Sequence, residues 1–206
     1  MSFKLLGING SLTPPPSRTR SVLDVALAAA SAYDSTVETE VLELRDFALE
    51  FCDGRSPDNY NSDTKRALAL VEEADAYLVA TPIYRGSYTG ALKNFFDLVP
   101  NDPKGHDPLR GKVVGLLATG GSDHHYLILE HQLRPLFGFF GAYTPARAIY
   151  AVSRDFDAQK QPQGKLIEEL TQLGQEVLIL ARFLAQTPNL AHPERVGILR
   201  ADGIHV

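Results

Sequence analysis

The sequence has little cysteine, no clustered positive charge and no long apolar run, and each absence excludes a class of protein. Cys52 is the only cysteine among 206 residues, so the chain forms no internal disulfide and no zinc site of two or four cysteines. We expect Cys52 to be a buried or partly buried structural thiol. Lys and Arg are not clustered and the net charge is −5, which argues against nucleic-acid binding.

Membrane insertion and export are also disfavoured by the sequence. No segment approaches the roughly 18 consecutive apolar residues of a membrane-spanning helix, so we expect no membrane partner. The apolar stretch in residues 1–10 is too short for a secretory signal and a glycine turn follows it at once. These observations favour a cytoplasmic protein.

Length and composition indicate one folded domain with a short appendage. The apolar fraction is 44 %, which is ordinary for a globular protein that buries a substantial core. Residues 187–206 are punctuated by proline and differ in character from the preceding helical pattern. We therefore predict a domain over residues 1–186 and a C-terminal tail over 187–206 that packs on a neighbouring subunit or frays.

Short apolar runs alternate along the chain with helical patterns. The runs at 76–81 and 113–119 show no alternation of apolar and polar residues, as expected for strands covered on both faces. Apolar residues spaced by three and four predict the helices. The predicted strands are 4–9, 40–44, 76–81, 113–119 and 147–152, and the predicted helices are 17–33, 62–74, 90–99, 126–140 and 166–184.

This strict alternation predicts an α/β fold in which helices cover both faces of a parallel sheet. Five strands in a chain of this length fit a flavodoxin-like three-layer sandwich with strand order 2-1-3-4-5. Such a fold binds its ligand at the carboxyl ends of the strands, near the switch point between strands 1 and 3. The loops after Asn9, Thr81 and Thr119 are therefore the places to seek a site.

The first of these loops, residues 10–19, follows a strand and opens a helix. Helix N-termini present unpaired N–H groups that suit a phosphate. Ser11, Ser17 and Thr19 add hydroxyl groups, and Arg18 adds positive charge. The loop matches neither the Walker A pattern nor GxGxxG, so it suits a monophosphate. The alternative is a helix that is simply capped by Ser17 after a proline-rich turn.

The second loop, residues 81–90, leaves the third predicted strand. A flavin ring needs flat apolar contact and nearby backbone N–H groups, and Pro82, Ile83 and Tyr84 have the shape to provide that contact. Arg85 has the charge to meet a nucleotide phosphate or the flavin face. The alternative is a surface loop with an exposed tyrosine.

The third loop, residues 118–125, contains two consecutive glycines after a buried strand. Gly120 and Gly121 allow the backbone to approach a ligand closely. Ser122 and the neighbouring amides are suited to bond the pyrimidine edge of a flavin. The alternative is a tight turn that only starts the next helix.

Longer motifs around these loops carry a family resemblance. They are GSLTPPPSRT at 10–19, TPIYRGSYTGALKNFFDLVP at 81–100 and GKVVGLLATGGSDHHYLILEHQLRPLFGFFGA at 111–142. With these motifs the chain resembles the NAD(P)H-dependent FMN reductases of the flavodoxin-like superfamily, above all those that serve two-component alkanesulfonate monooxygenases. The resemblance implies FMN as cofactor, NADPH or NADH as co-substrate, a flavin-dependent monooxygenase as partner, and a homodimer or homotetramer.

The resemblance also implies a role for each loop. By position, the phosphate is held by Ser11, Ser17, Arg18 and Thr19, the isoalloxazine ring by Pro82, Ile83, Tyr84 and Arg85, and its polar edge by Thr119, Gly120, Gly121 and Ser122. Hydride transfer to a flavin needs no protein acid or base, so no catalytic side chain is predicted. The first loop is one residue longer than the family's Gly-Ser-x-Arg pattern, and the nucleotide preference is not predicted.

The predicted helix 126–140 contains Pro135, which removes a backbone donor and kinks a helix. In the sulfonate-system reductases that the chain resembles, this helix can carry an inserted residue as a π-bulge at a tetramer interface. His131 lies near that point. It is either an interface residue or an ordinary surface histidine.

Three other functions compete with the reductase. A flavodoxin-type electron carrier binds FMN but does not oxidise NADPH unaided, and a quinone or azo reductase on the same fold passes electrons to an organic acceptor. A metal site at His124, His125 and His131 lacks a carboxylate pattern that would complete it. We therefore predict no metal.

Overall fold

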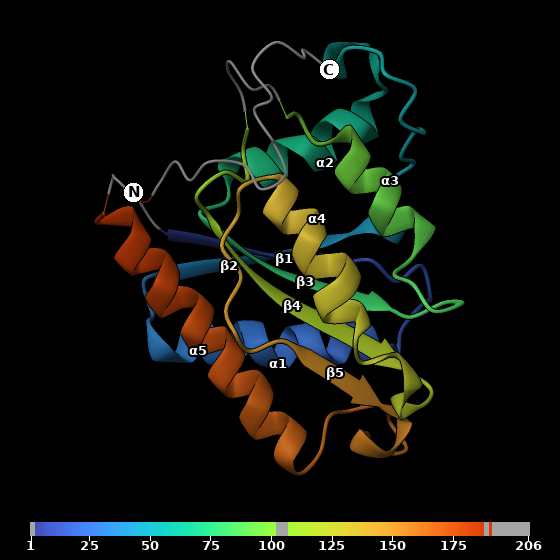
Figure 1. The fold of residues 1–206 in the computed structure, drawn as a ribbon, viewed down its shortest axis with the longest axis vertical. Coiled ribbons are helices and arrows are strands. Elements are labelled where there is room, and N and C mark those ends of the chain that lie inside the picture. The colour runs from blue at the N-terminus through green and yellow to red at the C-terminus, as the bar shows by residue number, and fades with distance from the viewer. Residues whose placement is uncertain (1–2, 102–106, 188–189, 191–206) are drawn as a thin grey trace, which may run out of the picture.

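A computed structural model describes residues 3–101, 107–187 and 190. Its centre is one sheet of five parallel strands in the order β2-β1-β3-β4-β5, drawn in Figure 1. The predicted strand order is therefore confirmed. The strands are β1 (Phe3–Asn9), β2 (Val37–Glu43), β3 (Ala76–Pro82), β4 (Val113–Gly120) and β5 (Ile149–Val152).

Helices cover both faces of the sheet and give the predicted three layers (Figure 1). One face is covered by α1 and α5, and the other by α2, α3 and α4. The α-helices are α1 (Arg18–Tyr33), α2 (Ser62–Glu73), α3 (Gly90–Leu98), α4 (Arg134–Phe139) and α5 (Lys165–Ala185). Single 3₁₀ turns occur at Leu44–Asp46, Pro57–Asn59, Asp123–His125 and Ser153–Asp155.

The central and edge strands differ in burial, which explains one wrong boundary. Every residue of β3 is buried, as its unbroken apolar run predicts. The edge strand β2 begins at Val37 and not at the predicted residue 40. Glu38 and Glu40 pair with β1 but are exposed charges, so the first half of the strand does not stand out as an apolar run. Charged side chains are common on edge strands, where they discourage pairing with other chains.

The two helices on the first face touch at a glycine. A Cβ atom built on Gly174 of α5 would lie 2.1 Å from the backbone oxygen of Ala26 in α1. Only a residue without a side chain allows the two backbones to approach this closely. This contact fixes where α5 crosses α1.

The predicted helix 126–140 is divided into segments. Leu129–Leu133 is a π-helical turn, in which the N–H of Arg134 donates to the oxygen of Leu129, five residues earlier. Pro135 follows at once and has no N–H to offer, and its ring would crowd a carbonyl four residues back. The wider turn accommodates the proline. The family resemblance implies that this helix can carry a π-bulge, and the turn at Leu129–Leu133 is one.

Cys52 corrects a prediction. The residue is exposed and not buried, because it lies in the irregular segment between β2 and α2. Its thiol donates to the oxygen of Asp97 at 3.2 Å, and its N–H donates to the side chain of Asn94 at 3.0 Å.

In the part of the chain that the structure describes, no helix is long and apolar enough to cross a membrane. The predicted tail 187–206 lies outside the described residues except for Thr187 and Leu190. The hydroxyl of Tyr143 donates to the oxygen of Leu190 at 2.9 Å.

Candidate active site at the carboxyl ends of the strands

The loops that follow β1, β3 and β4 meet at one edge of the sheet, as parallel pairing requires. Between them lies an open cavity of about 320 Å³, a size typical of small-molecule sites. Its lining contains all the predicted site residues except Arg85 and Ser122. The full lining is Ser11, Thr13, Pro16, Ser17, Arg18, Thr19, Pro82, Ile83, Tyr84, Thr119, Gly120, Gly121 and Lys160.

A buried acid holds the start of the first loop. Glu43 at the end of β2 accepts a hydrogen bond from the Asn9 amide at 2.9 Å and forms an ion pair with Arg20. The other atom of the Asn9 amide accepts from the N–H of Ser11 at 3.1 Å, and Ser11 Oγ in turn accepts from the N–H of Thr13 at 3.2 Å. The loop is thus fixed before any ligand binds. Sequence reasoning missed Glu43 because strand pairing alone brings it beside Asn9.

The first turn of α1 forms the polar end of the cavity. Ser17 caps the helix, since its Oγ accepts from the N–H of Arg20 at 3.4 Å. Arg18 donates from Nη1 to Ser153 Oγ at 2.9 Å, whereas its Nε is buried without a hydrogen-bond partner in the described residues. The unpaired N–H groups of this turn and the unsatisfied guanidinium nitrogen both favour an anion.

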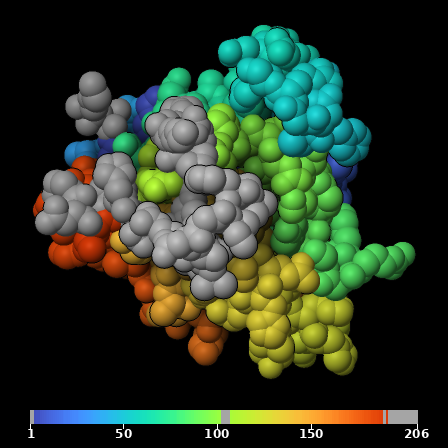
Figure 2. Space-filling model, turned by 45° about the horizontal axis from the view of Figure 1, so that its top comes forward, coloured from blue at the N-terminus to red at the C-terminus, as the bar shows by residue number. Residues whose placement is uncertain are grey.

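The second loop forms a tight hairpin. Tyr84 and Ser87 exchange two backbone hydrogen bonds, of 2.9 and 3.1 Å, around Arg85 and Gly86, whose φ angles are 54° and 77°. Two positive φ angles are the mark of a type I′ turn. Arg85 therefore lies exposed at the hairpin tip, outside the cavity lining. This hairpin stands out from the body of the molecule in Figure 2.

The base of the same hairpin forms a wall of the cavity. The N–H of Ile83 donates to the oxygen of Thr119 at 2.8 Å, which ties the second loop to the third. Tyr84 is 54 % exposed, and its hydroxyl lies 3.4 Å from Thr13 Oγ1. A tyrosine in this position presents a flat apolar face to the cavity while its polar end meets the first loop.

The third loop is packed against Tyr150 of β5. The Tyr150 hydroxyl donates to the oxygen of Ser122 at 2.7 Å, and a Cβ atom on Gly120 would lie 2.0 Å from that hydroxyl. A Cβ atom on Gly121 would meet nothing within 4 Å. Gly120 is thus required for packing, whereas Gly121 borders open space. Ser122 is not in the lining, and its Oγ lies 3.1 Å from His124 Nδ1.

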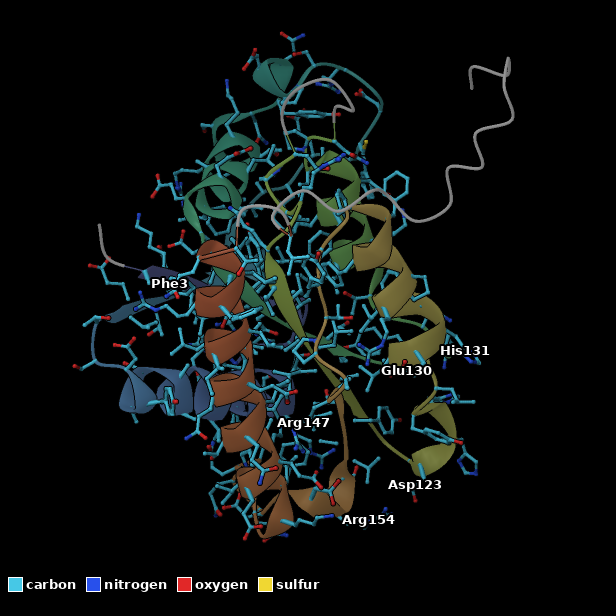
Figure 3. The ribbon with its side chains drawn as sticks, turned by 60° about the vertical axis from the view of Figure 1, so that its left-hand side comes forward. Phe3, Asp123, Glu130, His131, Arg147 and Arg154 are labelled. Carbon is cyan, nitrogen blue, oxygen red and sulfur yellow. The ribbon has the colours of Figure 1, made fainter. Side chains whose placement is uncertain are left out.

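An ion pair ties the end of the third loop to the turn after β5. Asp123 accepts two hydrogen bonds of 2.7 Å from Arg154, and Figure 3 shows the two side chains together, away from Glu130 and His131. Hydrogen bonding to Arg154 lowers the pKa of Asp123. Both side chains are more than half exposed, so the pair contributes little to stability.

Lys160 enters the cavity from a part of the chain that gave no sequence signal. Its Nζ donates to the oxygen of Pro16 at 2.8 Å. Thr13 and Pro16 are the other lining residues that were not predicted. Both belong to the predicted first loop, but neither was assigned a role.

A second cavity, of about 370 Å³, lies at the opposite end of β1. Its lining includes Glu38, Glu40 and Glu73 against the single cation Lys4. This acidic surface repels phosphate groups. The carboxyl-end cavity, with Arg18 and Lys160, is therefore the candidate site for an anionic ligand.

Comparison with known proteins identifies the family to which the chain belongs. The model of the NADPH-dependent FMN reductase family matches residues 3–157. The chain belongs to that family. It is an NAD(P)H-dependent FMN reductase, an oxidoreductase that uses FMN and a reduced pyridine nucleotide.

Individual relatives of this FMN reductase span most of its length. It is 40 % identical over 177 residues to an NAD(P)H-dependent FAD/FMN reductase of Geobacillus thermodenitrificans, covering 85 % of this chain and 92 % of that one. It is 38 % identical over 155 residues to the NADH-dependent FMN reductase SfnF of Pseudomonas putida, covering 75 % and 80 %. The apo crystal structure of the NADH:FMN oxidoreductase EMOB has a TM-score of 0.73 and 28 % identity, covering 93 % and 95 %.

Proposed function

We propose that this FMN reductase binds FMN in the carboxyl-end cavity and transfers hydride to it from NADPH or NADH. Arg18 carries the proposal, because this cation lines the same end of the cavity as the N-terminus of α1, whereas Pro82, Ile83 and Tyr84 give the cavity an apolar wall. A cation and a helix N-terminus together favour a bound phosphate. FMN combines such a phosphate with a flat apolar ring.

The first loop would hold the phosphate. We assign this role to Ser11, Ser17, Arg18 and Thr19, as the sequence predicts. The helix N–H groups and the guanidinium supply charge-assisted hydrogen bonds. Ser17 Oγ already caps α1, so we expect its hydroxyl hydrogen to be the part that remains free to donate.

The other two loops would hold the ring. We assign Pro82, Ile83 and Tyr84 to its apolar faces, and Thr119, Gly120 and Gly121 to its polar edge. When bound, the flavin supplies the acceptor for the hydride of the nucleotide. The chain's residues then act by orienting the two reactants, which is the main source of rate acceleration in such a reaction.

Arg85 and Ser122 require separate assignments. We assign Arg85 to the phosphates of the nucleotide, because its exposed guanidinium stands at the tip of the hairpin beside the cavity. We assign the backbone N–H of Ser122 to the polar edge of the ring. The backbone oxygen of Ser122 already accepts from Tyr150, and its hydroxyl lies beside His124.

The deciding experiment is oxidation of NADPH and of NADH by the purified protein, with and without added FMN. We expect rapid oxidation that depends on FMN. If FMN binds but neither nucleotide is oxidised, the protein is an electron carrier. If a quinone or an azo dye is reduced far faster than FMN, the protein belongs functionally with the quinone and azo reductases.

We further propose a cytoplasmic homodimer or homotetramer that supplies reduced FMN to a flavin-dependent monooxygenase. Tyr126, Leu127 and Phe139 are all more than 40 % exposed around the π-helical turn and α4, and such patches often mark subunit interfaces. Residues 1–186 would form the reductase domain, with 187–206 as an arm between subunits. Light scattering of the full chain and of a chain ending at residue 186 tests this assembly.

A further inference from the structure

We propose that Lys160 is a phosphate-binding residue of the FMN site, a second cation that acts beside Arg18. The proposal deepens the proposed function and rests on it. Lys160 lies between β5 and α5, just beyond residues 3–157 that match the family model.

The turn that carries Lys160 is built to hold one conformation. The Asp157 carboxylate accepts from the N–H groups of Gln159 and Gln161 at 2.9 and 2.8 Å. The N–H of Lys160 donates to the oxygen of Asp157 at 3.0 Å. Lys160 has a φ of 62°, a conformation that lysine rarely adopts. Residues persist in such conformations where their surroundings impose them, and they cluster at functional sites.

Two hydrogen bonds dock this turn on the phosphate loop. Lys160 Nζ donates to the oxygen of Pro16 at 2.8 Å, and the oxygen of Lys160 accepts from Ser21 Oγ in α1 at 2.8 Å. The ammonium therefore lies beside the first turn of α1 and lines the cavity with Ser17 and Arg18. An ammonium carries three hydrogens, so the bond to Pro16 leaves others to donate to a ligand.

The charge at this end of the cavity is not neutralised by the protein. Within residues 3–101 and 107–187, neither Lys160 nor Arg18 forms an ion pair with a carboxylate. The nearby acids are engaged elsewhere: Asp157 bonds backbone groups of its own turn, and Glu43 pairs with Arg20. Two cations and a helix N-terminus are thus left facing one small volume, which suits the dianionic phosphate of FMN.

The test compares FMN with riboflavin, which lacks the phosphate. Dissociation constants are measured by flavin fluorescence for the wild type, Lys160→Gln and Lys160→Arg. The matched control is Lys165→Gln, since Lys165 is 83 % exposed on α5 and pairs only with Glu169 in the described residues. We expect K160Q to weaken FMN binding about tenfold, as the loss of one charge-assisted bond predicts, and to leave riboflavin binding unchanged. K160R should retain most of the FMN affinity, and K165Q all of it.

Three outcomes would overturn the proposal. Equal weakening of FMN and riboflavin by K160Q would mean that Lys160 only supports the turn. A raised KM for NADPH with unchanged KM for NADH and unchanged FMN affinity would place the lysine on the nucleotide's extra phosphate. If the wild type binds neither flavin, the proposed function fails together with the role of Lys160. The first two outcomes reject the role of Lys160 alone. Thermal unfolding of each variant confirms that it is folded.

Discussion

The side-chain oxygens of Thr19 and Thr119 lie 2.7 Å apart, although the two residues are separated by 100 positions in the chain. Both are buried. The bond joins the first turn of α1 to the end of β4, so it fixes the proposed phosphate end of the cavity relative to the proposed edge of the flavin ring. It is a direct link between two loops that sequence motifs identified separately.

Removing one of these hydroxyl groups should cost more than removing both. Thr119→Val leaves the Thr19 hydroxyl buried without its partner, so we expect a loss of about 1–3 kcal/mol in the free energy of unfolding. The double variant T19V/T119V should recover part of this loss, because neither side then carries an unpaired group. Urea unfolding of the wild type, the two single variants and the double variant measures the coupling free energy between the two hydroxyl groups. Strictly additive losses would show that the bond has no energetic importance.

Replacement of each of the two glycines of the third loop by alanine should have different effects on stability. In Gly120→Ala the new methyl group collides with the Tyr150 hydroxyl and breaks its bond to Ser122, so we expect a loss of about 1–3 kcal/mol. Gly121→Ala adds a methyl group in open space and should change stability by less than about 0.5 kcal/mol. It should nevertheless weaken FMN binding, because that space is where we propose the ring edge lies. Unfolding and flavin titration of both variants check this, and unchanged FMN affinity in G121A would contradict the assignment.

Gly174→Ala should loosen the contact between α1 and α5. The methyl group would press on the backbone oxygen of Ala26, which no rotamer change can move. Overpacking of this kind costs about 1–3 kcal/mol, partly offset by the roughly 1 kcal/mol that alanine gains over glycine in a helix. The exposed Gln172→Ala on the same helix is the control and should be nearly neutral. A G174A variant as stable as the control would show that the helices separate freely.

Tyr77 should make the enzyme less stable at alkaline pH. Burial raises the pKa of Tyr77, whose hydroxyl donates to the oxygens of Val71 and Pro108. Above pH about 10 the tyrosine ionises in the unfolded chain but not in the folded one, so its contribution to stability is present below that pH and is lost above it. Burial lowers the pKa of Lys112, so its contribution to stability rises with pH, opposite to that of Tyr77. The contribution of Lys112 stops changing above pH about 10.4, where the lysine is neutral in the unfolded chain as well.

Tyr77→Phe isolates this effect. The variant should be less stable than the wild type at neutral pH by about 1–2 kcal/mol, because it loses the hydroxyl bonds. That difference should shrink as the pH rises past about 10, since phenylalanine cannot ionise. Urea unfolding over this range measures both curves. A difference that is constant with pH would contradict the buried neutral tyrosine.

The sheet order and the meeting of three loops could be predicted because they follow from local patterns. Unbroken apolar runs alternate with helical ones, and parallel strands bring the loops after Asn9, Thr81 and Thr119 to one edge. An irregularity in the helix over 126–140 was likewise predictable, since an interior proline such as Pro135 removes a backbone donor and kinks a helix, but the π-helical form of the turn came only from the family resemblance.

Side chains placed by distant contacts could not be predicted. Lys160 reaches the cavity only because a turn after β5 docks on α1, and Glu43 supports Asn9 only through pairing of β1 with β2. Arg85 was expected at a nucleotide phosphate or at the flavin ring, and the two positive φ angles that place it at the hairpin tip could not be predicted from its sequence neighbours. Cys52 is exposed in the irregular segment between β2 and α2, and a count of cysteines does not reveal how such a segment packs.

The parallel sheet also governs the order in which the site can form. Each strand meets a partner far along the chain: Leu5 pairs with Ala76, and Leu117 with Ile149. Pairings between such distant residues are slow to form, because a long loop must close first. During synthesis the turn with Lys160 emerges only after every strand of the sheet. With Lys160 in the FMN site as proposed, free FMN stabilises the finished protein by mass action and has no complete site to bind on a partly made chain.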